Sequence, residues 1–130
     1  MIQGIDHVAL NVKNLDEAVE FYTQILGLKV TQREYSKPGL EYFLDAGSAL
    51  IGLIQGNPEG SQPHPFAQEG IGANHLSFRV KTKDFDAMLQ KLQNAKVEIM
   101  FAKKREKSWS MYFKDMDGNK LEMTAWPHED

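Results

Sequence analysis

Residues 4–13, GIDHVALNVK, align without gaps with residues 72–81, GANHLSFRVK, at an offset of 68 residues. Four of the ten positions are identical, and the apolar positions correspond. In both segments apolar and polar side chains alternate, which is typical of a half-buried β-strand. The chain therefore carries one strand pattern twice, and the second copy opens a second half of the sequence.

A second pair of matching segments supports a duplication. Residues 42–45 and 50–53 (YFLD and LIGL) correspond to residues 112–115 and 120–123 (YFKD and KLEM), at an offset of 70 residues. Apolar spacing predicts helices over residues 15–26 and 83–95. Strands are expected over residues 5–12, 29–34, 41–45, 49–55, 73–80, 97–103, 108–114 and 120–125. We therefore predict an α+β fold of two βαβββ modules, and a chance match of short strand patterns is the alternative.

Length and composition limit what such a chain can be. A length of 130 residues with 42% hydrophobic residues and a net charge of −3 is typical of one globular domain. We expect a first module over residues 1–57, a linker loop over 56–72 and a second module over 72–127, within a single domain 1–130. The absence of cysteine excludes disulfides and thiolate metal sites.

Charge and hydropathy also argue against two classes of partner. A sequence pI near 5.8 gives no electrostatic reason to bind nucleic acid. The apolar runs are too short to span a membrane, and the N-terminus lacks the pattern of a signal peptide. We therefore expect a cytoplasmic protein that binds neither nucleic acid nor a membrane.

The polar face of three predicted strands carries possible metal ligands. Strand alternation places His7, His75 and Glu122 on faces opposite the apolar, helix-facing side chains. A helix-backed sheet open to water would also be polar on its outer face, but that does not explain histidine at equivalent positions of both repeats. Two imidazoles and a carboxylate suit one divalent ion of iron, manganese, nickel, cobalt or zinc. The first-half equivalent of Glu122 is Gly52, so a fourth protein ligand is missing.

Three motifs, in order, resemble a known family. Residues 5–12 with 15–22 and 26–28 are similar to the opening of the vicinal oxygen chelate superfamily, which includes glyoxalases, bleomycin resistance proteins and extradiol dioxygenases. Residues 74–80 resemble the first strand of its second module. Residues 112–122, YFKDMDGNKLE, resemble its closing segment.

This resemblance implies a fold and a function. The expected fold has mixed sheets forming a cup around a divalent metal held by His7, His75 and Glu122. The expected activity is that of a glyoxalase- or dioxygenase-type enzyme, in which a small substrate chelates the metal through vicinal oxygens. Both lyase or isomerase chemistry and ring-cleaving dioxygenase chemistry stay open, and no catalytic group is assigned. The resemblance also implies a homodimer, in which the metal is held within one chain or across two.

The departures from the family pattern separate the branches. Glyoxalase I-like members have a first-module carboxylate where this chain has Gly52. Fosfomycin-type thiol transferases carry a longer tail after the glutamate, whereas this chain ends eight residues past Glu122, which disfavours that branch. A metal-free protein that sequesters an antibiotic or metabolite, of the bleomycin-resistance type, is the alternative function.

Five further residues are candidates for substrate binding. Asn11 and Arg79 share the strand faces of the histidines and could hold a substrate carboxylate, although ordinary exposed strand residues would look the same. The aromatic candidates are Tyr42 and Tyr112, interpreted as repeat equivalents, and Trp109. Core packing is the alternative for each aromatic residue.

Overall fold

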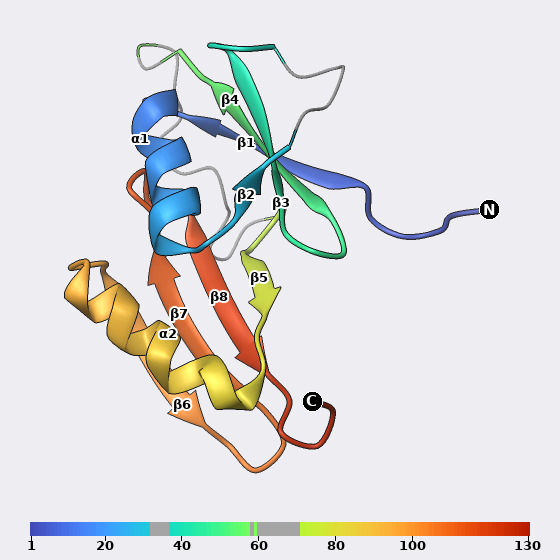
Figure 1. The fold of residues 1–130 in the computed structure, drawn as a ribbon, viewed down its shortest axis with the longest axis vertical. Coiled ribbons are helices and arrows are strands. Elements are labelled where there is room, and N and C mark those ends of the chain that lie inside the picture. Colours follow the sequence, from blue (N-terminus) through green and yellow to red (C-terminus); the bar gives the residue numbers. More distant parts are fainter. Residues whose placement is uncertain (32–36, 58, 60–70) are drawn as a thin grey trace. The chain divides into compact units, whose positions relative to one another are not determined.

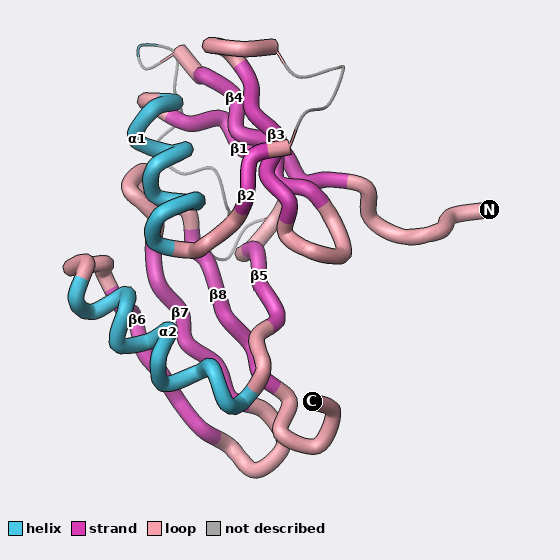
Figure 2. Tube along the Cα trace, viewed as in Figure 1, coloured by secondary structure: helices cyan, strands magenta, loops and turns pink. Residues whose placement is uncertain are grey.

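The computed structural model describes residues 1–31, 37–57, 59 and 71–130. The chain forms two compact units, Met1–Ser61 and Gln62–Asp130. Each unit contains a four-stranded mixed sheet and a helical segment, in the same order along the chain (Figures 1 and 2). The predicted fold of two βαβββ modules is confirmed. Most of the predicted linker loop lies outside the described residues.

The first unit builds its sheet in the order β1-β4-β3-β2. Strand β1 (His7–Val12) pairs in parallel with β4 (Leu50–Gln55), and the other pairs are antiparallel. The remaining strands are β3 (Glu41–Asp45) and the short β2 (Lys29–Val30). Of the strand predicted over residues 29–34, the structure shows Lys29–Val30 as strand, and residues 32–36 lie outside the described residues.

The second unit repeats this topology with the order β5-β8-β7-β6. Strand β5 (Leu76–Arg79) pairs in parallel with β8 (Lys120–Ala125), and β7 (Trp109–Lys114) lies between β8 and β6 (Ile99–Lys104). The helix α2 (Thr82–Asn94) follows β5, as the sequence predicts. The same strand order in both units means that repeat positions can be compared strand by strand.

The helix of the first unit begins where its sequence predicts and changes its geometry midway. Asn14 caps α1 (Leu15–Glu20), because its Oδ1 accepts a hydrogen bond from the backbone N–H of Glu17 at 3.0 Å. The chain continues as one π-helical stretch, η1 (Phe21–Ile25). Gly27, with φ of 81°, then takes the left-handed conformation that ends the helical segment.

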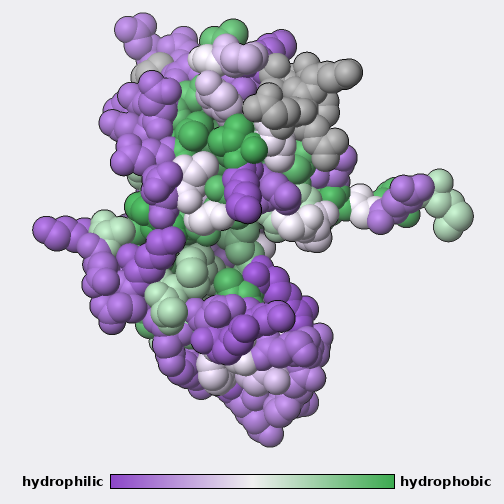
Figure 3. Space-filling view, in the orientation of Figure 1, coloured by the Kyte–Doolittle hydropathy of each residue, from purple (hydrophilic) through white to green (hydrophobic). Residues whose placement is uncertain are grey.

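The apolar face of each sheet forms the core beside its helix. In the first unit the buried side chains include Leu10, Val12, Leu44, Leu53 and Tyr22. In the second unit they include Phe85, Leu92, Met111, Phe113 and Leu121. Hydrophilic side chains dominate the surface over α2 in the lower part of Figure 3. In the second unit, the face of the sheet turned away from α2 carries polar side chains.

No helix in the described ranges combines the length and the apolar character that crossing a bilayer requires.

Candidate metal centre

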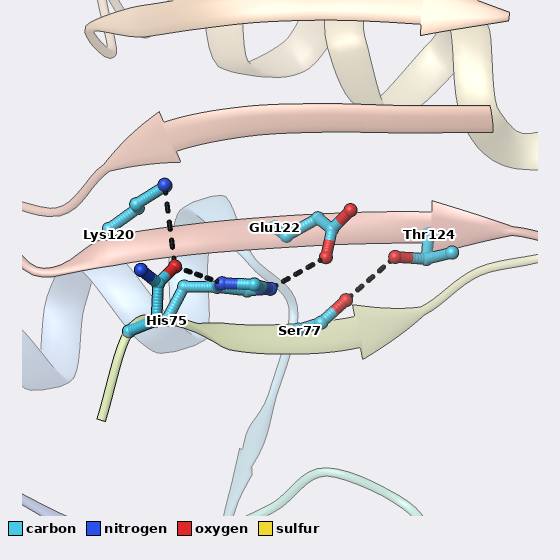
Figure 4. Close-up of polar contacts among 6 residues, drawn as sticks. His75, Ser77, Lys120, Glu122 and Thr124 are labelled. Atoms are coloured by element: carbon cyan, nitrogen blue, oxygen red, sulfur yellow. Dashed lines mark hydrogen bonds and ion pairs between the residues drawn. The ribbon is translucent and has the colours of Figure 1, made fainter. Parts of the chain in front are cut away.

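The second unit brings two of the three predicted ligands together. His75 directly precedes β5, and Glu122 lies in the neighbouring strand β8, opposite Ser77. The His75 Nε2 and Glu122 Oε1 atoms are 3.0 Å apart (Figure 4). The side chain of Glu122 is 9% exposed and that of His75 28% exposed, so one edge of the pair stays accessible.

Hydrogen bonds keep the Glu122 carboxylate in its charged form. Burial alone would raise its pKa. Hydrogen bonds from the hydroxyls of Ser110, Ser77 and Tyr112, together with the charge of His75, outweigh burial and hold the pKa of Glu122 below its usual value. The carboxylate is the form that binds a cation. The pKa of Tyr112 is raised, first by the burial of its hydroxyl and second by the charge of Glu122, so Tyr112 keeps its proton.

The ring of His75 is held on its other side as well. Its Nδ1 atom lies 2.7 Å from Oδ1 of Asn74, and Nζ of Lys120 lies 3.5 Å from the same oxygen. The Tyr112 ring packs edge-on against His75, with centroids 5.2 Å apart. Figure 4 shows His75 directed toward Glu122 and Ser77 directed toward Thr124. The hydroxyl oxygens of Ser77 and Thr124 are 2.8 Å apart.

The first unit places His7 at the repeat-equivalent position. Its Nδ1 atom lies 2.7 Å from Oδ2 of Asp6, which matches the contact between His75 and Asn74. Its ring meets that of Phe43 edge-on, with centroids 5.3 Å apart, and its side chain is 41% exposed. Both predicted histidines therefore present Nε2 away from the residue that precedes them in sequence.

Gly52 has no side chain, and neighbouring apolar side chains occupy the space where the carboxylate lies in the second unit. It pairs with Ala9 and Phe43, as Glu122 pairs with Ser77 and Tyr112. A Cβ atom at Gly52 would lie 3.0 Å from Cε1 of Phe43 and 3.5 Å from Cβ of Ala9. The equivalent surface of the first unit is therefore apolar.

The donor set of the second unit fits a divalent ion. Imidazole nitrogen and carboxylate oxygen are ligands of iron, manganese, cobalt, nickel and zinc. Two ligand atoms at about 2.1 Å from an ion and at right angles are about 3 Å apart, and the His75–Glu122 separation is 3.0 Å. Within either unit taken alone, the described residues gather no set of three possible ligands.

The predicted substrate residues fall into two groups. Tyr112 lies beside the ligand pair, since it packs on His75 and donates to Glu122. Arg79 follows Ser77 on the same face and contacts Glu129, with Nη2 3.2 Å from the backbone oxygen. Asn11 is an exposed residue of β1, on the face of His7.

The other two aromatic candidates require correction. Tyr42 pairs with Leu53 and faces the side of the sheet opposite His7, so Phe43, not Tyr42, is the structural equivalent of Tyr112. Trp109 packs against Phe85 of α2, with centroids 5.6 Å apart, and therefore lies on the face opposite Glu122. Neither Tyr42 nor Trp109 is carried into the proposed site.

Four supporting residues were not predicted from the sequence. Ser110 alternates with Trp109 and Met111, so strand periodicity alone would have placed it beside Tyr112. Asn74 and Asp6 precede the two histidines at equivalent repeat positions, which is a signal that the alignment contained. The approach of Lys120 to Asn74 depends on the pairing of β5 with β8 and has no local signal.

Comparison with known proteins points to one family. The sequence profile of the Glyoxalase/Bleomycin resistance protein/Dioxygenase superfamily matches residues 4–123. A metallothiol transferase FosB of Staphylococcus haemolyticus (strain JCSC1435) is 28% identical over 132 residues, which cover 100% of this chain and 88% of that protein. A glutathione transferase FosA of Serratia marcescens is 31% identical over 123 residues, covering 95% and 81% of the two chains.

A solved structure shows the same fold. It is a mutant of the fosfomycin resistance protein FosX from Listeria monocytogenes, complexed with Mn(II) and 1S,2S-dihydroxypropylphosphonic acid. The TM-score is 0.75 at 22% identity, and the match covers 99% of this chain and 96% of that one. These relatives belong to the fosfomycin-resistance branch, contrary to the expectation that the sequence disfavours that branch.

Proposed function

The chain belongs to the Glyoxalase/Bleomycin resistance protein/Dioxygenase superfamily, and on this basis we propose that it is a divalent-metal-dependent enzyme acting on a small oxygenated molecule. His75 and Glu122 are two of the proposed ligands. His7, the repeat equivalent of His75, is the proposed third. We further propose that the protein works as a homodimer.

The pairing of His75 with Glu122 is the observation that carries this proposal. A buried carboxylate on a polar sheet face is costly unless it has a partner. Here Glu122 is buried, has a lowered pKa and faces an imidazole nitrogen at 3.0 Å. When bound, a metal ion would polarise a substrate oxygen and stabilise negative charge that develops on it.

The surrounding residues would orient the substrate and keep the ligands in place. Ser110 and Ser77 donate to Glu122 and hold the carboxylate in position. Tyr112 keeps its hydroxyl proton and donates a hydrogen bond to Glu122, so it also helps to hold this carboxylate in position. Asn11 and Arg79 are the proposed polar contacts further along their strands.

The relatives favour one branch of the chemistry. The two sequence relatives are named a metallothiol transferase and a glutathione transferase, and the relative with the solved structure is a fosfomycin resistance protein. We therefore propose transferase chemistry before lyase or dioxygenase chemistry, with fosfomycin as the first substrate to test and Mn(II) as the first ion. Iron, nickel, cobalt and zinc are the other ions that this donor set accepts.

Metal content of the purified protein tests the proposal. We expect close to one transition-metal ion per chain by elemental analysis after incubation with Mn(II) and desalting, and a loss of the ion in Glu122→Gln. Glu98→Gln is the matched control, because Glu98 is an exposed carboxylate that pairs with Lys114 at 3.4 Å. An unchanged metal content in Glu122→Gln would contradict the proposed site.

The substrate is tested on the metal-loaded protein. Fosfomycin with a small thiol is the first pair, and its consumption is followed by mass spectrometry, with the Glu122→Gln variant as the blank. If the wild-type protein takes up no divalent ion, the proposed enzyme function is wrong. The alternative, a metal-free binding protein of the bleomycin-resistance type, then becomes the proposed function.

A further inference from the structure

We propose that Asn74 is a positioning residue for His75, and that its amide oxygen holds the Nδ1 proton so that Nε2 is the atom left for the metal. Asp6 has the same role toward His7. Lys120 fixes the orientation of the Asn74 amide. This role rests on the proposed metal site, and it belongs to residues that orient the ligands without binding the ion themselves.

The contact between Asn74 and His75 defines which ring nitrogen carries a proton. An amide oxygen can only accept a hydrogen bond, so Nδ1, which lies 2.7 Å from it, has to donate. If Nδ1 instead carried a lone pair, two acceptors would face each other at that distance. A ring that binds a metal through one nitrogen keeps its proton on the other, which here is Nδ1.

The orientation of the amide follows from its second neighbour. A lysine ammonium can only donate, and Nζ of Lys120 lies 3.5 Å from the same Oδ1 atom. A flipped amide would set its NH₂ group against both the ammonium and the Nδ1 proton. The ammonium also lies over the Tyr112 ring, 4.9 Å from its centroid, which keeps the lysine on this side of the sheet.

The other ring nitrogen faces the second proposed ligand. Nε2 of His75 is directed at Oε1 of Glu122, 3.0 Å away. The two proposed ligand atoms therefore face each other, and an ion held between them would leave the contact between Nδ1 and Asn74 intact.

The duplication supplies an independent second case. Asp6 precedes His7 as Asn74 precedes His75, and its Oδ2 atom lies at the same distance of 2.7 Å from Nδ1. Two different side chains with an acceptor oxygen thus make the same contact in both repeats. What the two positions share is the acceptor, and not the charge, which indicates that the hydrogen bond to Nδ1 is the property that matters.

Metal affinity and the Nδ1 proton are the two readouts of the test. Residues that hydrogen-bond a ligating histidine change metal affinity by about 10- to 100-fold when removed. Because Asn74 is exposed, we expect Asn74→Ala to weaken Zn(II) binding about tenfold in calorimetry, at the lower end of that range. In the Zn(II)-loaded protein, the slowly exchanging Nδ1 proton of His75 should be seen by NMR in the wild type and lost in the variant.

Matched variants separate positioning from a general loss of structure. Asn74→Asp keeps an acceptor oxygen and should retain both the affinity and the Nδ1 signal. Asn94→Ala, which removes an amide near the end of α2 that accepts from Gln90, is the control with no expected effect. Asp6→Ala should weaken binding as Asn74→Ala does, and Asp6→Asn should restore it. If Asn74→Ala fails to fold, Lys120→Met still tests the contacts from Lys120 through Asn74 to His75. A smaller loss of Zn(II) affinity is then expected than for Asn74→Ala.

Two results would overturn the inference, and they differ from a failure of the proposed function. Equal Zn(II) affinity in wild type and Asn74→Ala, or an Nδ1 proton that persists unchanged in that variant, excludes the positioning role alone. A wild-type protein that binds neither Zn(II) nor Mn(II) overturns the proposed function first, and this inference with it.

Discussion

Gly52 stands where the second unit carries Glu122, and the residues around it have adapted to a missing side chain. The Phe43 ring lies over Gly52, 3.0 Å from where a Cβ atom would be, and meets His7 edge-on. The first unit therefore offers His7 beside an apolar surface, whereas the second offers His75 beside a carboxylate. This asymmetry between the repeats resides in single residues and not in the fold.

Substitution at Gly52 should expose this packing. We expect Gly52→Ala to lower the free energy of unfolding by about 1–3 kcal/mol, because the added methyl group would lie only 3.0 Å from Cε1 of the buried Phe43 ring. Urea denaturation at neutral pH measures the change. In a Phe43→Leu background the same substitution should be less destabilising, since the ring no longer opposes the methyl group. Strict additivity of the two substitutions would contradict this account.

At the scale of elements, the hairpin before Glu122 depends on one carboxylate. Asp115 is 6% exposed, and its Oδ1 atom accepts from the backbone N–H groups of Asp117 and Asn119, each at 2.9 Å. Its Oδ2 atom accepts from the side-chain amide of Asn119 at 2.7 Å. This turn sets the register in which β8 returns along β7, and thus which residue of β8 pairs with Tyr112.

Removal of that carboxylate should be strongly destabilising. Asp115→Ala leaves buried donors of Asn119 without an acceptor, and we expect a loss of about 3 kcal/mol in the free energy of unfolding. Asp115→Asn keeps one acceptor oxygen and should lose less. Thermal and urea denaturation compare the two variants with wild type. An equal loss for both would show that the acceptor geometry is not the cause.

The start of α2 is held by a residue far away in sequence. The Asp130 carboxylate accepts from the backbone N–H of Thr82, at 3.1 Å to Oδ1, and from the Thr82 hydroxyl. Lys81, at the N-cap position, provides no side-chain hydrogen bond. The Thr82 hydroxyl first, then its backbone N–H and the charges of Arg79 and Lys81, lower the pKa of Asp130 below its ordinary value of 3.8.

This contact predicts a pH dependence of stability. Because the pKa of Asp130 is lower in the folded protein, its contribution is fully present above the unfolded value and is lost as the pH falls through the folded value. We expect Asp130→Ala to lower the urea midpoint at pH 7, and the difference from wild type to shrink as the pH falls below about 4. Glu106→Gln, in the exposed turn after β6, is the control. A difference that stays constant down to pH 3 would contradict the assignment.

At the scale of the whole molecule, metal binding and folding would be interdependent if the proposed ligands from both units hold one ion. A ligand that binds only the folded protein stabilises it by about 2.7 kcal/mol when present at 100 times its Kd. We expect Mn(II) to raise the Tm of wild type in differential scanning calorimetry and to leave that of Glu122→Gln unchanged. His7→Ala should retain less than the full increase. An equal increase in all three proteins would show that the ion binds elsewhere.

Mixing of variants decides which chain supplies His7. If a metal is shared across a dimer, His7→Ala and Glu122→Ala protomers together regain one complete site, and metal content rises above that of either variant alone. If each site lies within one chain, the mixture stays at the level of the separate variants. Light scattering on the same samples measures the proposed dimer.

The sequence by itself determined the duplicated fold and the faces of the strands, because side-chain alternation and helical spacing are local properties. That periodicity placed His7 and His75 at matched positions of the two repeats. It also placed Glu122 on the same strand face as Lys120, which lies two residues earlier. The cap at Asn14 and the helix end at Gly27 were equally local. For this reason the predicted elements and the observed ones agree closely outside the residues near β2.

Only the tertiary structure decided which residues of different strands meet. The connection from β3 to β4 spans residues 46–49, whereas that from β7 to β8 spans 115–119, one residue more. This single insertion makes Phe43, and not Tyr42, the equivalent of Tyr112. Strand register depends on turn length, and a shift of one residue reverses the face on which a side chain lies. The contacts of Ser110 with Glu122 and of Lys120 with Asn74 are set by the same pairing, which no local pattern encodes.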